Sequence, residues 1–306
     1  MKHIFIVNPK SGKKDSTEFI KKYLQENHNE LNYVIYNTKS KGDAIEYVKN
    51  ECKNKTEEIT FYACGGDGTV NEVINGAYGF DGVFVTVYPC GSGNDFVKVF
   101  GEENYFLDLS KLINGKPRKV DLMDVNGRLS INMVNLGFDG ATAYNMVKFK
   151  RLPLVSGKGA YNIALVYSLL FKMKHKCKIY MDNEEVFNGK MLLTAVGNGF
   201  CCGGGYYCLP EATVEDGLMD AVAIKTISRL RFITLVKKYK NGTYLHDPKY
   251  QNIITFRKCK EVKLVSEKPI AYSIDGECDI ANEINITIIP GAINFIVPTE
   301  YDSQNS

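Results

Sequence analysis

The sequence predicts an α/β protein in which an N-terminal three-layer domain, Rossmann-like or phosphofructokinase-like, precedes a C-terminal β-sandwich-like domain. Its 306 residues exceed the ~100–200 of one typical domain, and 44% of them are hydrophobic, which suffices to fill two cores. The first third of the chain alternates strand-like and helix-like segments, whereas short strand-like segments dominate after residue 120. This change of rhythm indicates two domains.

The N-terminal third has the rhythm of a parallel sheet covered by helices. The expected strands are 4–7, 31–36, 58–64 and 83–88, and the expected helices are 16–27, 42–52 and 70–78.

The remainder of the chain favours antiparallel sheets. The expected strands are 129–134, 178–181, 190–196, 220–224, 261–265, 270–274 and 285–289, interrupted by helices near 157–173 and 228–240. Because Gly115-Lys116-Pro117-Arg118 ends the helical pattern, we place the boundary between Pro117 and Met123. Residues 1–121 then form the first domain and 122–290 the second, and the sequence leaves open whether 291–306 rejoins the first.

Composition narrows the class of protein. A charged fraction of 24% with 11% aromatic residues argues against disorder. The longest apolar run, 161–171, is about half of the ~20 residues that a membrane-spanning helix needs, so we expect a buried helix there. The apolar stretch before Asn8 is too short for a signal peptide, and the nine cysteines lack a paired spacing. We therefore expect a cytoplasmic protein with reduced thiols.

The first expected strand ends in a polar loop. Asn8, Pro9, Lys10, Ser11 and Gly12 stand between this strand and a helix, where backbone N–H groups and a helix N-terminus favour a phosphate. This signal is weak alone, since Asn-Pro and Ser-Gly also mark ordinary turns.

The run from Cys64 to Glu72 is a stronger signal. Its three glycines allow a nucleotide to approach the backbone closely. We expect Thr69 to cap the following helix, which leaves Asp67 free to face a metal ion or the reacting phosphate. The alternative is a tight strand-to-helix turn with Asp67 as a local cap.

The run from Pro89 to Phe96 repeats this pattern after the next strand. Two glycine loops are therefore expected side by side at the carboxyl edge of the sheet, where open α/β sheets bind ligands. This second run has neither the Gly-Lys-Ser/Thr ending of a phosphate loop nor the Gly-x-Gly-x-x-Gly spacing of a dinucleotide site, so conventional ATPases and dehydrogenases lose support.

Taken in order, these motifs resemble the diacylglycerol kinase catalytic-domain family, and within it the soluble bacterial lipid kinases. The resemblance spans nearly the whole chain. It rests on Asn8 to Gly12, Thr38 before Gly42-Asp43-Ala44, Gly65 to Glu72, Gly91 to Phe96, Asp216-Gly217, and Asp275-Gly276-Glu277. An ordered set of motifs is more specific than any one of them.

The resemblance implies an ATP-dependent kinase that phosphorylates a hydroxyl group of a lipid such as diacylglycerol. ATP is expected in domain 1–121 and the lipid in domain 122–290, with the reaction in a cleft between them and Asp67 handling Mg²⁺-ATP. The implied ATP-binding residues are Asn8, Pro9, Lys10, Ser11, Gly12, Thr38, Gly66, Asp67, Gly68, Thr69, Val70, Asn71, Glu72 and Ser92.

The resemblance also implies that Asp275 and Glu277 join Asp67 in catalysis. One of the two takes the proton from the substrate hydroxyl, and the sequence leaves open which one. Without the resemblance, Asp275-Gly276 between alternating apolar residues is a common hairpin signal.

A further segment, Leu209 to Asp220, resembles the one that binds a structural Mg²⁺ in this family. The implied ligands are Thr213, Asp216 and Leu218, partly through backbone carbonyls. One carboxylate with carbonyls and waters makes a modest site, and Asp216-Gly217 is also an ordinary turn.

Charge is unevenly distributed along the chain. Residues 141–260 contain 19 Lys and Arg against 8 Asp and Glu, although the whole chain carries only +3. Basic and apolar residues interleave at 148–151, 172–176 and 229–240, which favours peripheral docking on an anionic membrane. A solvated basic face is the alternative. No nucleic-acid motif accompanies the charge, so we expect no nucleic-acid partner.

Two other functions stay open. An NAD kinase shares the Gly-Gly-Asp-Gly-Thr turn and the pair Asn71-Glu72, although the loops at 8–12 and 91–96 favour the lipid kinase. A lipid-binding protein that no longer catalyses is the other alternative, against which Asp67, Asp275 and Glu277 argue. The sequence does not select among lipid substrates, and it leaves the oligomeric state, a homodimer included, open.

Overall fold

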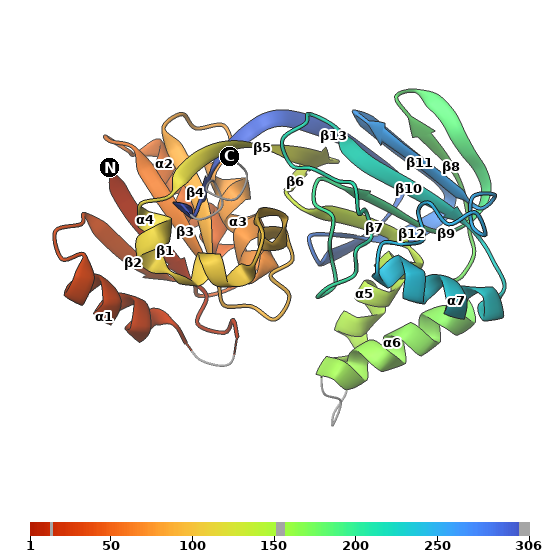
Figure 1. The fold of residues 1–306 in the computed structure, drawn as a ribbon, viewed down its shortest axis with the longest axis horizontal. Coiled ribbons are helices and arrows are strands. Elements are labelled where there is room, and N and C mark those ends of the chain that lie inside the picture. The colour runs from red at the N-terminus through yellow and green to blue at the C-terminus, as the bar shows by residue number, and fades with distance from the viewer. Residues whose placement is uncertain (13–14, 151–156, 300–306) are drawn as a thin grey trace. The chain divides into compact units, whose positions relative to one another are not determined.

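The structure is a computed structural model that describes residues 1–12, 15–150 and 157–299. The chain forms two compact units (Figure 1). The first combines Met1–Leu122 with the segment from Pro290 onward, and the second comprises Met123–Ile289. A mixed α/β unit followed by a β-rich unit confirms the predicted fold class.

A parallel sheet forms the centre of the first unit. Its strands are β1 (Lys2–Val7), β2 (Tyr33–Asn37), β3 (Ile59–Gly65), β4 (Val83–Pro89) and the end of β13 (Glu277–Val297). They lie in the order β13-β4-β3-β1-β2, and each neighbouring pair is parallel. This order brings the ends of β1, β3 and β4 together at one edge.

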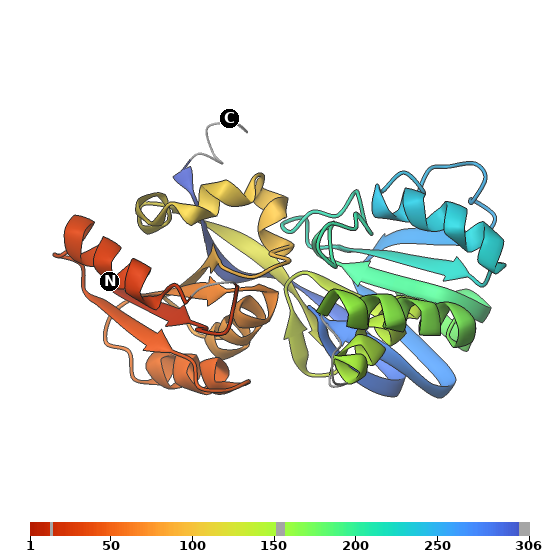
Figure 2. The ribbon, with the colours of Figure 1, turned by 90° about the horizontal axis from the view of Figure 1, so that it is seen from below.

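Helices cover both faces of this sheet, as Figure 2 shows. One face carries α1 (Thr17–Asn27), α4 (Leu109–Ile113) and the short 3₁₀ helices Phe96–Phe100 and Glu103–Leu107, and the other carries α2 (Asp43–Lys53) and α3 (Asp67–Ala77). The Tyr23 hydroxyl of α1 lies 2.8 Å from Ser110 Oγ of α4, which joins two helices of the same face. The three layers predicted for this unit are confirmed.

The second unit is a β-sandwich-like assembly. Its strands are the end of β5 (Lys116–Val125), β6 (Arg128–Ser130), β7 (Met133–Gly137), β8 (His175–Met181), β9 (Glu184–Gly197), β10 (Met219–Lys225), β11 (Ile254–Cys259), β12 (Glu261–Ile274) and the start of β13. They run in the order β11-β10-β9-β7-β12-β13, with antiparallel pairing throughout this path. β8 pairs with the outer parts of both β9 and β12, which folds the sheet over on itself.

Two hydrophobic cores result in this unit. One lies between the strands and includes Ile179, Val196 and Ile286. The other lies between the strands and the helices α5 (Phe138–Phe149), α6 (Gly157–Phe171) and α7 (Arg229–Lys240), which share one side of the sheet (Figures 1 and 2). Phe138 of α5 packs against Phe232 of α7 with ring centroids 4.7 Å apart.

The helix α5 was not predicted from the sequence. This helix follows Gly137, whose φ is +75°, and contains Gly140, so its local sequence is a poor helix signal. The structure supplies the reason for Gly140: a Cβ there would lie 2.4 Å from the Ala271 carbonyl oxygen and 2.8 Å from that of Asn135. Direct packing of the helix backbone on β12 and β7 therefore stabilises α5.

The helix predicted at 157–173 is present as α6, but the expectation that it is buried was wrong. Its small residues Ala160, Ala164 and Ser168, spaced four apart, face the core. Its large apolar side chains face outward: 42% of Ile163, 56% of Val166, 48% of Leu170 and 67% of Phe171 is exposed. The run 161–171 reads as continuously apolar because both the inner and the outer face of the helix carry apolar residues. No described helix is long and apolar enough to cross a membrane.

Candidate functional site

The loops at the carboxyl edge of the first sheet form the candidate site. All the residues predicted to bind ATP lie in these loops or in the first two turns of α3: Asn8, Pro9, Lys10, Ser11, Gly12, Thr38, Gly66, Asp67, Gly68, Thr69, Val70, Asn71, Glu72 and Ser92. Because β1 to β4 are parallel, their ends meet at the same edge.

The two glycine loops touch through their backbones. A Cβ added to Gly91 would lie 2.5 Å from the Gly66 Cα, so only glycine allows this approach. The Cys90 amide also donates to the Gly65 carbonyl at 2.8 Å, which continues the β3–β4 pairing into the loops. The loops predicted side by side are in direct contact.

The loop after β1 joins this contact from the other side. Asn8 Nδ2 donates to Thr69 Oγ1 at 3.4 Å, and Asn8 Oδ1 accepts from the Lys10 amide at 3.1 Å. Gly12 has φ +79°, and a Cβ there would lie 2.2 Å from the Cys90 carbonyl oxygen. Three loops far apart in sequence therefore form one surface built mainly of backbone.

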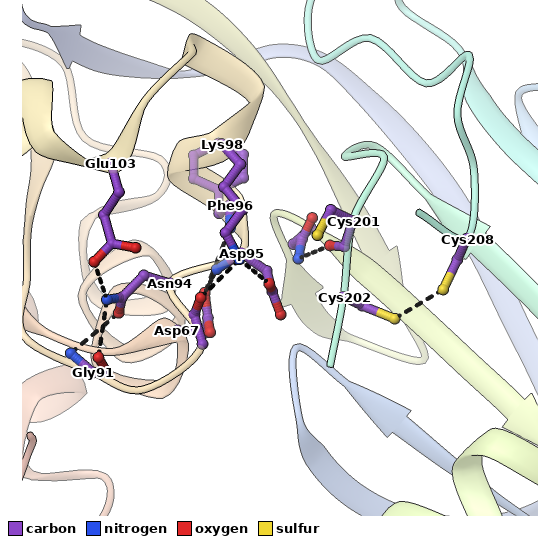
Figure 3. Close-up of polar contacts among 12 residues, drawn as sticks. Asp67, Gly91, Asn94, Asp95, Phe96, Lys98, Glu103, Cys201, Cys202 and Cys208 are labelled. Atoms are coloured by element: carbon purple, nitrogen blue, oxygen red, sulfur yellow. Dashed lines mark hydrogen bonds and ion pairs between the residues drawn. The ribbon is translucent and has the colours of Figure 1, made fainter. Parts of the chain in front are cut away.

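Asn94 holds the second glycine loop closed, as Figure 3 shows. It is buried in the left-handed conformation, with φ 47°. Its side chain accepts from the Gly91 amide at 3.1 Å and donates to the Gly91 carbonyl at 3.0 Å and to Glu103 Oε1 at 2.8 Å. Its short amide side chain suits this backbone conformation, since Asn tolerates it better than most residues do.

Asp67 ties α3 to the second glycine loop (Figure 3). Its Oδ1 accepts from the Asp95 amide at 2.8 Å and is 3.5 Å from the Phe96 amide. Lys98 Nζ in turn donates to the Gly93 carbonyl at 2.9 Å and pairs with Asp95 at 2.6 Å. The expectation that Asp67 is free to face a ligand was wrong for Oδ1, because backbone amides already use that oxygen.

The start of α3 also differs from the prediction. We expected Thr69 to cap the helix, but α3 begins at Asp67, and its N-cap is Gly66 with no side-chain cap. Gly66 is fully extended, with φ −100° and ψ −170°, so the chain turns into the helix earlier. Thr69 Oγ1 instead accepts a hydrogen bond from Asn8 Nδ2. The N-terminus of α3 therefore directly follows the first glycine loop, an arrangement that favours an anion.

Two of the predicted residues, Glu72 and Thr38, hold the loop after β2 in place. Glu72 Oε1 accepts from the Gly42 amide at 2.9 Å, and Gly42 itself has φ +84°. The Thr38 amide donates to the Val7 carbonyl at 2.9 Å, which fixes the end of β2 beside the end of β1. Glu72 thus has a structural partner within the loop surface.

In the second unit, Asp275 and Gly276 form the two-residue turn between β12 and β13. Ile274 pairs with Glu277, and the turn residues have φ 46° and 89°, as a type I′ hairpin requires. Asp275-Gly276 therefore forms a hairpin turn, and this holds whether Asp275 or Glu277 acts in catalysis.

The Asp275 carboxylate is buried and accepts four hydrogen bonds. Ser130 Oγ and the amides of Asn132 and Met133 donate to Oδ1 at 2.8, 3.1 and 2.9 Å. The Ile131 amide donates to Oδ2 at 2.9 Å. This carboxylate therefore anchors the hairpin to the segment between β6 and β7, while Glu277 beside it is only half-buried.

The residues predicted to hold a structural Mg²⁺ lie together around Asp216. The Leu218 amide donates to its Oδ1 at 3.1 Å, and hydrogen bonds from Thr213 and Lys258 outweigh burial and lower its pKa. Lys258 Nζ lies 3.0 Å from both Asp216 Oδ2 and Asp220 Oδ1.

Asp220 is a neighbour that the sequence did not indicate. It is 1% exposed, burial raises its pKa, and in the described chain neither carboxylate oxygen accepts a well-aligned hydrogen bond. Two neighbouring carboxylates fit Mg²⁺, although the Lys258 ammonium group already pairs with both of them. A metal ion here stays a prediction.

The sequence also missed a polar group of α5. Asp139 of α5 is half-buried, and the Tyr239 hydroxyl donates to its Oδ2 at 3.1 Å. Burial raises the pKa of Asp139 to about 6, opposed by this hydrogen bond. The thiols of Cys202 and Cys208 lie 3.1 Å apart beside Gly203 to Gly205 (Figure 3). A predicted α5 would have been the only signal for Asp139.

A parallel sheet with touching glycine loops at its carboxyl edge is typical of α/β proteins that bind phosphates, and a β-sandwich-like unit accompanies it in this chain. Residues 2–125 match the family model for the diacylglycerol kinase catalytic domain. Residues 132–297, more than half of the chain, match the model for the YegS C-terminal NAD kinase beta sandwich-like domain. The chain belongs to the diacylglycerol kinase catalytic-domain family of bacterial lipid kinases, and it is a lipid kinase, a phosphotransferase.

Individual relatives agree with this family. A protein named diacylglycerol kinase from Bacillus subtilis is 28% identical, over 89% of this chain and 88% of the relative. A protein named as a YegS-like lipid kinase from Enterobacter is 26% identical over 95% of both chains.

Solved structures share the fold. A diacylglycerol kinase from Bacillus anthracis superimposes with a TM-score of 0.72 at 23% identity, over 98% of both chains. An NAD kinase from Archaeoglobus fulgidus reaches 0.50 at 14% identity, over 99% of this chain and 96% of that one.

The Asp275 anchor predicts a stability effect. Replacing Asp275→Asn puts an amide group among four donors, so we expect the free energy of unfolding to fall by about 2–3 kcal/mol. Urea unfolding followed by circular dichroism measures this change. The control is Asp279→Asn, at an exposed position of β13. Equal unfolding midpoints for the two variants would contradict the anchoring role.

The raised pKa of Asp139 predicts a pH effect. Its folded pKa of about 6 exceeds the usual 3.8, so the folded chain binds more protons between these values and stability falls as pH rises through the window. The shift corresponds to about 3 kcal/mol. Asp139→Asn removes this loss, so the stability of the variant relative to the wild type rises between about pH 4 and pH 7. A pH-independent difference in thermal unfolding would refute the assignment.

Proposed function

We propose that this lipid kinase transfers the γ-phosphoryl group of ATP to a hydroxyl group of a glycerolipid such as diacylglycerol. The observation that carries the nucleotide part is the backbone contact of Gly66 with Gly91, which builds an amide-rich surface beside the start of α3. The lipid part rests on the family and on relatives named diacylglycerol kinase. At 14% identity the matched NAD kinase shows a common fold alone, so no structural observation adds to the shared Gly-Gly-Asp-Gly-Thr turn and Asn71-Glu72 pair on which that alternative rests.

The nucleotide phosphates are proposed to lie against the two glycine loops and the first turn of α3. Mg²⁺, when bound with the nucleotide, neutralises charge on the phosphates. Asp67 fits such an ion, because Mg²⁺ commonly uses one or two carboxylates together with substrate phosphates. Asp67 would then connect the ion to the second loop through its bond with the Asp95 amide. Ligand binding and loop position are thereby coupled.

Glu277 is the better candidate for the base. Phosphoryl transfer needs a carboxylate that accepts the proton of the substrate hydroxyl. Asp275 is buried and already accepts four hydrogen bonds, whereas the half-buried Glu277 follows directly after the turn that Asp275 anchors. We assign proton acceptance to Glu277 and a positioning role to Asp275. The reaction requires both units to act on the same pair of substrates.

The helical side of the second unit is proposed to contact an anionic membrane. Leu230 and Ile233 of α7 are 80% and 52% exposed, and the large apolar residues of α6 face outward as well. Arg229 of α7 donates to the carbonyls of Leu169 at 3.0 Å and Leu170 at 2.8 Å, which joins the two helices. The basic residues around them supply charge complementarity to acidic lipids. Of the basic run 148–151, Arg151 lies outside the described residues.

The catalytic assignment predicts distinct losses. We expect Glu277→Gln to lower kcat by about 100-fold or more, because the proton acceptor is lost. Asp67→Asn should lower kcat and also weaken ATP binding, because it affects both metal handling and loop position. Labelled ATP with detergent-dispersed diacylglycerol measures both, and Asp279→Asn is the control. Full activity of Glu277→Gln, with loss in a folded Asp275→Asn variant, would transfer the role of base to Asp275.

The membrane assignment predicts a loss of vesicle binding. Replacing Leu230→Ser removes an apolar side chain that would insert among lipids, so we expect about tenfold weaker binding to anionic vesicles. The matched control is Leu107→Ser, at an exposed leucine of the first unit. Sedimentation with vesicles measures the change. If both variants sediment like the wild type, the proposed surface is not the docking surface.

A further inference from the structure

A pocket of about 540 Å³ opens in the second unit between α5, α6, the start of β8 and the outer half of β12. Tyr144 of α5 and Tyr167 of α6 contribute aromatic surface to its lining, and the chain from Glu267 to Ala271 forms part of it. None of its lining residues belongs to the glycine loops or to the Asp275 turn. The pocket is therefore separate from the groups assigned to catalysis.

The pocket is strongly basic. Five lysines line it against a single carboxylate, that of Glu267: Lys148, Lys172, Lys174, Lys176 and Lys268. Lys176 Nζ pairs with Glu267 at 2.5 Å. In the part of the chain that the structure describes, the other four lysines form no ion pair with a carboxylate. Four ammonium groups around one hollow repel one another, and an anion bound among them relieves that repulsion.

The chain is held so that these lysines stay at the pocket. His175 Nε2 donates to the Lys172 carbonyl at 2.9 Å, which fixes the turn from α6 into β8. Burial lowers the pKa of His175, so this ring does not add to the charge at neutral pH. Lys148 Nζ lies 4.4 Å from the centroid of the Tyr144 ring, a cation–π contact that orients its ammonium group.

The rim of the same pocket is apolar. Phe171 and Ile280 line it and are 67% and 50% exposed. Phe171 ends α6, whose outward-facing Val166 and Leu170 continue the apolar surface. A basic hollow with an apolar rim matches a molecule that has an anionic head and an acyl tail.

We infer that this pocket binds the head group of a lipid that carries a phosphate monoester, with its acyl chains along the outer face of α6. A phosphate monoester carries a charge of about −1.5 to −2 at pH 7, whereas a phosphodiester lipid carries only one negative charge. The four unpaired lysines therefore favour the monoester. The inference rests on the lipid kinase assignment. A lipid with a phosphate monoester is also the class of molecule that a lipid kinase produces, so the product would retain the enzyme on the membrane.

Vesicle binding without ATP tests the inference on the full chain. The probes are phosphatidylcholine vesicles containing phosphatidate, or phosphatidylglycerol at matched surface charge, with glycerol 3-phosphate as a soluble competitor. The test variant is Lys172→Gln/Lys268→Gln. The control is Lys21→Gln/Lys49→Gln, which removes equal charge from exposed positions of α1 and α2 in the first unit, outside the pocket. Thermal unfolding of both variants verifies that they are folded.

We expect the wild type and the control to bind phosphatidate vesicles about tenfold tighter than phosphatidylglycerol vesicles, and the pocket variant to lose this preference. Equal affinity of the wild type for both lipids, or equal losses in both variants, overturns the inference. Displacement from phosphatidate by glycerol 3-phosphate at equal concentration overturns it in favour of a soluble phosphate ester. Because no ATP is present, a failure of the proposed reaction appears only in the separate kinase assay.

Discussion

The contact between Gly66 and Gly91 is the constraint on which the candidate nucleotide site depends. Two loops can meet backbone to backbone only where neither carries a side chain, and this approach exposes amides rather than side chains. The parallel order of the strands brings the loop ends together, and the glycines then determine how close they come. Asp67 and Asn94 hold the second loop in place by accepting from its backbone amides.

In the second unit a carboxylate has the corresponding role. Asp275 satisfies three backbone amides and one hydroxyl in the segment from Ser130 to Met133 that links β6 to β7, and so positions the tight turn that carries Glu277. Both units thus use a buried or half-buried carboxylate as a backbone acceptor beside the proposed chemistry. A residue that looks catalytic in sequence can act by holding the residue that reacts.

The helical side of the second unit exposes large apolar side chains next to basic ones. The small residues of α6 face inward and its large apolar residues face outward, while basic residues gather at its end. Apolar exposure alone indicates a contact surface of unspecified kind. Basic residues around and within it give the surface its charge complementarity to anionic lipid.

Local sequence patterns were enough to predict the alternation that gives a three-layer unit, the strand-rich second unit, and the loops that carry Asn8, Gly66 and Ser92. These features are local, since hydrophobic periodicity and glycine positions follow from neighbouring residues. The folded structure was needed to show that α5 is helical, that the outer face of α6 is exposed, and which partners Asp67, Asp139 and Asp220 have. These depend on contacts between residues distant in sequence: Gly140 against Ala271, or Lys258 between Asp216 and Asp220. No local pattern encodes such contacts.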